Sequence, residues 1–294
     1  MLKVFCARKV FQSLLLISII FQLVGCAISP KQVCSNAVQI PETILSAKVV
    51  LLGEQHGTSE MPKFVTDSVC QFLAKGLSVD VGLELPIDEQ ARFDQYLRSG
   101  GKYEDIKALL NSSFWQRKSE EQDGRTSIAM LALIEWVRDV RTRGSNISLF
   151  AFDKSLAINT DKLPRDEAMA ANISERISRS TSDVTIVFAG NYHAMKVPLE
   201  GTSIKPMGSF LRYPQTVAFL LGHDGGTAWQ CSSSRCGVVE AGKCETPMPK
   251  KQKISLIGQE FPSWAKHLKV GYDGYFDIGC VTASLPANAA QSQR

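Results

Sequence analysis

The sequence predicts an α/β fold in which a mostly parallel central sheet carries helices on both faces and a C-terminal β-hairpin extends from it. Between residues 48 and 189, short β-branched apolar runs alternate with longer amphipathic segments. This alternation is typical of strand–helix units built around a parallel sheet. About 270 residues remain after the N-terminal apolar segment, which suits one large domain of this class.

The predicted elements follow one another in regular order up to residue 189. The second helical region divides at Gly100-Gly101, and Pro164 stands near the start of the last helix, where proline is favoured. Strands are predicted at 48–52, 79–85, 147–152 and 184–189, with helices at 61–75, 87–110, 126–143 and 164–179 between them.

The pattern changes in the last third of the chain. Residues 216–221 and 227–231, joined by the turn His223–Gly226, predict a β-hairpin, and 275–283 predicts one more strand. The α/β domain is therefore expected over 46–285. Residues 26–45 are expected to form a tether, and the small, polar residues 286–294 a disordered tail.

The N-terminus has the pattern of an export signal. Three basic residues precede the apolar run 10–23, whose length is typical of a signal-peptide core and short for a spanning helix. The run leads into Gly25-Cys26, and this ending resembles the lipobox of bacterial lipoproteins. The resemblance implies a signal peptide over 1–25 and lipid on the thiol of Cys26. The alternative is an uncleaved anchor helix with an incidental cysteine.

This resemblance places the chain in the bacterial cell envelope, bound to a membrane through the lipid on Cys26. Ala27 rather than aspartate follows the cysteine, which resembles lipoproteins sorted to the outer membrane, so the domain is expected to face the periplasm. Removal of Lys3, Arg8 and Lys9 lowers the formal net charge from +4 to +1 (4 − 3 = 1). Nucleic acid is therefore not expected as a partner. The oligomeric state is left open.

Six cysteines follow Cys26, an even number that favours disulfides in an oxidising compartment. A zinc site is the alternative, but the sequence has no C-x-x-C pair to support it. The sequence leaves the pairing open. These cysteines are Cys34, Cys70, Cys231, Cys236, Cys244 and Cys280.

Each of the first four predicted strands ends in polar residues. Because the carboxyl ends of parallel strands line one crevice, these side chains are expected to lie together. They would form a site for a small molecule or a peptide. The set comprises Glu54, His56, Glu84, Asp153 and His193. Glu54 as a helix cap and Asp153 as an ordinary loop aspartate are the structural alternatives.

Two chemistries fit this set of residues. His56, His193, Glu84 and Glu54 are a suitable ligand set for a divalent metal such as Zn, Mn or Co. Alternatively, a histidine acts as a general base on water while a carboxylate fixes its tautomer. Arg165 stands at a predicted helix start, where the helix dipole disfavours a cation, so a partner such as a site carboxylate or an anionic substrate is expected.

Several short motifs resemble one superfamily. Gly53–His56 and Gly190–His193, both G-x-x-H, resemble the motifs of the Tiki/TraB proteases. Residues 51–56 are similar to the haem-binding uptake lipoprotein ChaN, and 56–60 to the erythromycin esterases. Glu84 and the segment 165–170 extend the resemblance, which covers roughly 49–196.

The resemblance implies two functions and leaves a third possibility. The first is a hydrolase of ester, amide or peptide bonds. There His56 activates water, directly or through a metal shared with His193 and Glu84, and Arg165 stabilises the developing negative charge. The second is a haem- or iron-binding lipoprotein without turnover, in which Tyr192 or His223 replaces the further histidines that ChaN-like chains carry after the first motif. The third is an envelope protein whose crevice has lost its activity.

Overall fold

The computed structural model describes residues 38–157, 163–232, 235–244, 253–256, 261 and 263–291. The predicted signal peptide, Cys26 and Cys34 lie outside these residues. Among the residues described, no helix combines the length and apolar character needed to cross a membrane.

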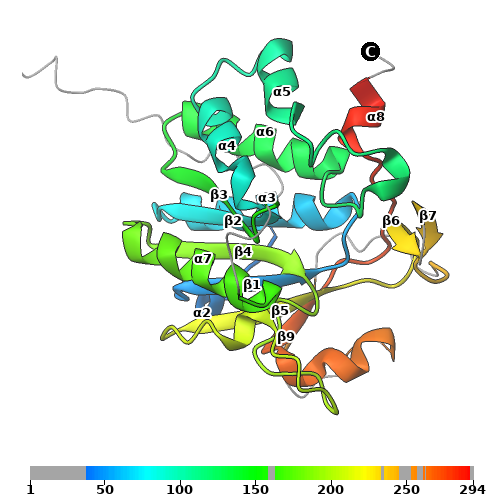
Figure 1. Cartoon of the computed structure of the whole chain (residues 1–294). Coiled ribbons are helices and arrows are strands. Elements are labelled where there is room, and N and C mark those ends of the chain that lie inside the picture. The colour runs from blue at the N-terminus through cyan, green and yellow to red at the C-terminus, as the bar shows by residue number, and fades with distance from the viewer. Residues whose placement is uncertain are drawn as a thin grey trace, which may run out of the picture. The chain divides into compact units, whose positions relative to one another are not determined.

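A seven-stranded sheet forms the centre of the fold, in the order β3-β2-β4-β1-β5-β9-β8 (Figure 1). Six strands run parallel, and β8 at the edge pairs antiparallel with β9. The predicted α/β class is thus confirmed. The strands are β1 (Val49–Glu54), β2 (Val79–Pro86), β3 (Ile147–Asp153), β4 (Val184–Gly190), β5 (Thr216–Gly222), β8 (Lys253–Leu256) and β9 (Gly274–Asp277).

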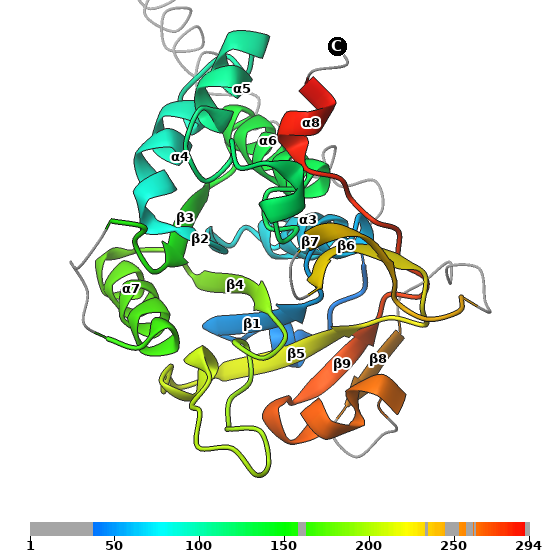
Figure 2. The ribbon, with the colours of Figure 1, turned by 45° about the vertical axis from the view of Figure 1, so that its right-hand side comes forward.

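Alternate residues of the central strands feed two separate apolar cores, one on each face. On β1, Val50 and Leu52 point into the first core, and Val49 and Leu51 into the second. Figure 2 shows three helices of the first core, α4 to α6, grouped apart from α7 of the second. The first core packs against α3 (Glu60–Ala74), α4 (Gln90–Leu97), α5 (Tyr103–Leu110) and α6 (Ile128–Thr142), the second against α7 (Arg165–Arg179), η4 (Met207–Ser209) and η5 (Ser263–Gly271).

The C-terminal hairpin exists, but its strands differ from those predicted. It pairs β6 (Thr227–Ser232) with β7 (Arg235–Glu240), whereas residues 216–222 form β5 between β1 and β9. The apolar residues of β5 explain the difference. Most of β5 is buried, and Ala218 and Leu220 face one core while Phe219 and Leu221 face the other. A strand buried on both faces belongs inside a sheet.

Both ends of the predicted domain extend further than the sequence indicated. Val38, Ile40 and Ile44 of the predicted tether are buried in the first core, and residues 42–45 form the short helix α2 (Glu42–Leu45). The tail prediction is wrong for 287–291, which form α8 (Ala287–Gln291). This alanine-rich segment favours a helix, and its buried first residue donates a backbone hydrogen bond to Thr126.

Two disulfides join four of the cysteines that follow Cys26. Cys231 is bonded to Cys236 across the β6–β7 hairpin. Cys244 is bonded to Cys280, which joins the segment after β7 to the segment after β9. These pairs confirm the preference for disulfides over zinc at four of the six cysteines.

Candidate active site

The polar residues after the first four strands lie together at one edge of the sheet. The strands β3, β2, β4 and β1 are consecutive neighbours and parallel, so their carboxyl ends meet there. Glu54 ends β1 opposite Gly190 of β4, and Asp153 ends β3 opposite Pro86 of β2. The topology therefore gathers the predicted residues from segments about 140 positions apart in the chain.

His56 pairs with two glutamates. Its Nδ1 lies 2.7 Å from Oε1 of Glu54, which is a hydrogen bond. Its Nε2 lies 3.6 Å from Oε2 of Glu84, which is beyond hydrogen-bond distance. Nδ1–H of His56 donates to Glu54, and this hydrogen bond fixes the orientation of the ring. Nε2 is then the nitrogen that can exchange a proton with a bound molecule.

His193 is held on both ring nitrogens. Nδ1 lies 2.7 Å from Oδ1 of Asp166, and Nε2 lies 2.9 Å from Nη1 of Arg165. The guanidinium can only donate, so Nε2 accepts and Nδ1 carries the proton that it donates to Asp166. This network assigns a neutral His193 whose lone pair supports Arg165.

Two arginines bind the carboxylates at the base of the cluster. Arg165 donates to Oε1 of Glu84 at 2.6 Å and to both carboxylate oxygens of Asp153 at 2.8 and 2.9 Å. Arg125 donates to Asp153 at 2.5 Å and to both oxygens of Asp123 at 2.7 to 3.1 Å. The expected partner of Arg165 is thus a pair of site carboxylates.

Burial divides the cluster into a base and an accessible layer. Glu54, Glu84 and Asp153 are at most 5% exposed. The side chain of His56 is 20% exposed and that of Arg165 is 39% exposed. A bound molecule therefore meets the imidazoles and the Arg165 guanidinium, while the carboxylates behind them set their charge and orientation.

Gly190, the first residue of the second G-x-x-H motif, forms the floor between the two imidazoles. Its N–H donates to Oε2 of Glu84 at 2.7 Å. A Cβ at this position would lie 3.1 Å from His56 Nε2 and 3.5 Å from His193 Cδ2. The motif thus places a residue without a side chain where the functional groups converge.

The charges of the cluster shift the pKa of several groups. Burial alone would lower the pKa of His56, but the negative charges of Glu54 and Glu84 outweigh it and raise this pKa to about 10. Burial raises the pKa of Glu54. For Glu84, burial is outweighed by the positive charges beside it, that of His56 above all, and these hold its pKa well below the usual range. The His56–Glu54 pair thus keeps its protons to higher pH than either group would in water.

The cluster does not fit a divalent metal. Glu84 already accepts from Arg165 and from Gly190, and the guanidinium of Arg165 faces Nε2 of His193. Of the four ring nitrogens of His56 and His193, Nε2 of His56 is the one that makes no hydrogen bond. Within the described part of the chain, no three histidine, cysteine, aspartate or glutamate side chains are arranged to hold a metal. The guanidinium of Arg165 supplies the positive charge that the sequence analysis expected from a metal ion.

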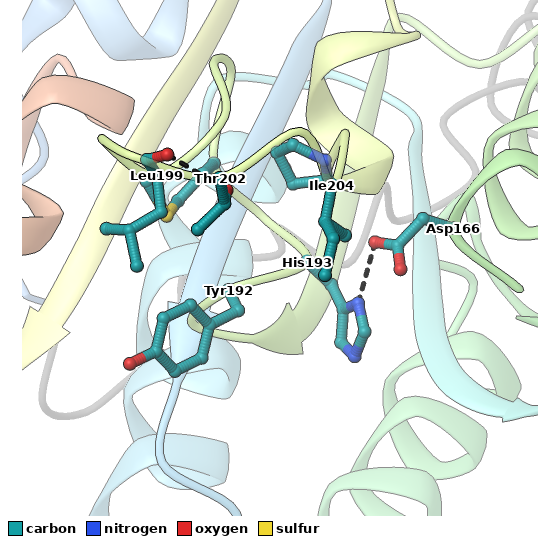
Figure 3. A pocket seen from close by; sticks show the side chains of 8 residues that line it. Asp166, Tyr192, His193, Leu199, Thr202 and Ile204 are labelled. Carbon is teal, nitrogen blue, oxygen red and sulfur yellow. Dashed lines mark hydrogen bonds and ion pairs between the residues drawn. The ribbon is translucent and has the colours of Figure 1, made fainter.

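The two residues proposed as haem ligands differ. His223 is buried, and its Nδ1 accepts from the Gly225 N–H while its Nε2 lies 2.5 Å from Oε1 of Gln55. Both nitrogens are engaged, so His223 does not fit an axial ligand. Tyr192 is 51% exposed, and its hydroxyl lies 3.3 Å from Nε2 of His267. It lines a cavity next to His193, as Figure 3 shows.

Three residues of the cluster were missed by the sequence prediction. Asp123 and Arg125 lie in the loop before α6, where neither periodicity nor a strand end marks them. Asp166 follows Arg165 directly, and its place in the R-D segment was the one available signal. Asp123 holds Arg125 against Asp153, and Asp166 orients His193.

Solved structures share this fold. Erythromycin esterase EreC, in a mutant form and an open conformation, matches with a TM-score of 0.59 and 14% identity over 83% of this chain and 93% of that chain. A Bacillus cereus protein matches with a TM-score of 0.57 and 14% identity, covering 83% and 91%. A succinoglycan biosynthesis protein matches with a TM-score of 0.56 and 14% identity, covering 89% and 99%. The resemblance to erythromycin esterases is thus confirmed for the fold.

The haem-binding ChaN of Campylobacter jejuni also matches, with a TM-score of 0.44 and 14% identity over 70% of this chain and 93% of that chain. No protein-family model matches the chain, and no curated protein matches its sequence. Similarity at this level establishes the fold and does not establish an activity, which depends on the residues of the cluster.

Proposed function

We propose that this protein is a hydrolase that uses His56 as a general base to activate water for attack on an ester, amide or peptide carbonyl, without a metal. The observation that carries the proposal is the His56–Glu54 pair, with its accessible Nε2 beside the half-exposed guanidinium of Arg165. A base fixed by a carboxylate, next to a donor for negative charge, is the arrangement that acyl transfer requires.

The reaction can be written with these groups. The water oxygen adds to the carbonyl carbon while its proton passes to Nε2 of His56, and the negative charge of Glu54 stabilises the imidazolium. Arg165 stabilises the oxyanion, and neutral His193 holds Arg165 from the other side. The tetrahedral intermediate then collapses: the carbon–oxygen or carbon–nitrogen bond breaks, and His56 returns its proton to the leaving atom.

The location of this activity belongs to the same proposal. The lipobox-like ending at Cys26 supports a lipid anchor, and the disulfides Cys231–Cys236 and Cys244–Cys280 support an oxidising compartment. The site would then face the periplasm from a membrane surface. Mass spectrometry of the N-terminal peptide tests this part through the mass added to Cys26, and an unmodified thiol would overturn it.

The first prediction concerns His56. Replacing it in the full-length protein, His56→Asn, removes the base, so kcat for hydrolysis of p-nitrophenyl esters is expected to fall by roughly 10² to 10⁴-fold. His267→Asn makes the same change at an exposed histidine outside the cluster, 3.3 Å from the Tyr192 hydroxyl, and is expected to keep the activity on p-nitrophenyl acetate. Unchanged kcat in a folded His56→Asn protein would contradict the proposal.

Haem binding without turnover is the alternative, and the half-exposed Tyr192 beside an apolar cavity is the observation that favours it. It predicts a Soret band on addition of haem that disappears in Tyr192→Phe. Tight haem binding together with no hydrolysis of any ester would replace the hydrolase proposal.

A further inference from the structure

A cavity of about 280 Å³ opens beside the catalytic cluster. In Figure 3, His193 and Asp166 lie at one side of it, and Tyr192, Leu199 and Ile204 surround the rest. The cavity therefore shares two residues with the cluster and is continuous with it. Its lining residues are Asp166, Tyr192, His193, Met195, Leu199, Thr202, Ile204 and Pro206.

The walls of this cavity are mostly apolar. Of the lining residues, Met195 is almost completely buried, whereas Ile204 is 75% exposed. Asp166 is the one charged side chain among the lining residues, and its Oδ1 already accepts two hydrogen bonds. With no lysine or arginine in the wall, a negatively charged group finds no partner there, whereas an apolar group buries the exposed aliphatic surface.

Asp166 links the cavity to the chemistry. Its Oδ1 accepts from Nδ1 of His193 and from the backbone N–H of Met207, both at 2.7 Å. Met207 begins η4 directly after the loop 197–206 that forms the outer wall. The carboxylate of Asp166 therefore sets both the position of this wall and the orientation of His193, which in turn supports Arg165.

We propose that the cavity binds an uncharged apolar group of the substrate, adjacent to the carbonyl that is hydrolysed. Its volume corresponds to roughly nine water molecules, so a branched alkyl, aromatic or medium-length acyl group fits, and a long acyl chain does not. This inference rests on the proposed hydrolase and names its substrate class: esters or amides with an apolar group on the acyl side or the leaving side.

The test compares p-nitrophenyl esters from acetate to decanoate with the full-length protein. Each buried methylene favours binding severalfold, so kcat/KM is expected to rise by roughly 10-fold or more from acetate to a medium chain length and then to level off. Leu199→Trp fills the cavity and is expected to abolish this rise, so that kcat/KM no longer depends on chain length. Thr202→Trp fills it from an exposed position, and Glu200→Trp adds the same ring outside it as the control.

Binding of octanamide, measured by calorimetry, separates this inference from the hydrolase proposal. Hydrolysis with no chain-length preference, or with equal effects of Leu199→Trp and Glu200→Trp, would overturn the cavity inference and leave the hydrolase standing. Octanamide binding that Leu199→Trp and Thr202→Trp both weaken, without hydrolysis of any ester, would support the cavity and overturn the hydrolase. Absence of both binding and hydrolysis would overturn both.

Discussion

The two histidines of the G-x-x-H motifs are equivalent in the sequence and different in the structure. His56 has one ring nitrogen bonded to a buried glutamate and the other accessible, whereas His193 is bonded on both sides by Asp166 and Arg165. The sequence could identify both residues because each follows a strand end. It could not assign their roles, because the partners come from segments that only the fold brings near.

The charge of Glu54 sets the pH at which His56 becomes a base. With the pKa of His56 raised to about 10, kcat/KM is expected to rise with pH above neutrality, beyond the range of an ordinary histidine. Glu54→Gln removes the largest raising charge, so the pKa falls and the rise is expected at lower pH. A pH–rate profile of both proteins measures the shift, and coincident profiles would contradict the role of Glu54.

Asp80→Asn is the control, because Asp80 is also a buried carboxylate of the sheet but pairs with Arg176 near the start of β2. It is expected to affect stability and leave the pH profile unchanged.

His56 also contributes to stability. Because its folded pKa lies above 6.5, the contribution is complete below pH 6.5 and is lost as the pH rises toward 10. The Tm of the wild type is therefore expected to fall over this range more than that of His56→Gln.

At the scale of elements, the strands and helices of the first two thirds were predictable because each strand is a short apolar run. The strand that pairs with β6 in the hairpin was not predictable. Residues 216–222 and 227–232 are adjacent in the sequence, but the burial of β5 on both faces decided its place in the sheet. The cluster was predictable where it follows strand ends. Asp123 and Arg125 lie on a loop whose path depends on its packing.

The loop after β1 has a positioning residue in His223. Burial lowers the pKa of His223, so the ring is neutral, with Nδ1 accepting from Gly225 and Nε2 donating to Gln55, the neighbour of His56. His223→Ala is expected to cost about 1–3 kcal/mol of stability and to lower kcat by roughly 10- to 100-fold, because His56 is less firmly placed.

A positioning role predicts that His223→Gln, which keeps a donor for Gln55, restores part of kcat while KM stays close to that of the wild type. The exposed pair Lys63–Asp67 on α3 offers a control, and Lys63→Ala is expected to leave kcat unchanged. If His223→Ala lowers stability without lowering kcat, the residue is only structural.

At the scale of the whole molecule, the two disulfides close loops of very different length. Cys244–Cys280 spans 36 residues and joins the segment after β7 to the segment after β9, whereas Cys231–Cys236 spans five. By loop entropy, the Cys244→Ser/Cys280→Ser protein is expected to lose about 4 kcal/mol of unfolding free energy, and Cys231→Ser/Cys236→Ser about 2 kcal/mol. Denaturant unfolding measures both, and an equal or reversed order would contradict the loop-length argument.

The carbonyl of Gly57, the residue after His56, accepts hydrogen bonds from the N–H groups of Trp229 and Ser284 at 2.9 and 2.8 Å. Both donors belong to the last quarter of the chain. A ribosome completes His56 early, but the residues that fix its loop are made nearly last. The loop that carries His56 therefore gains these two contacts only when nearly the whole chain has been made, and a protein cut short before Ser284 would carry the motif without them.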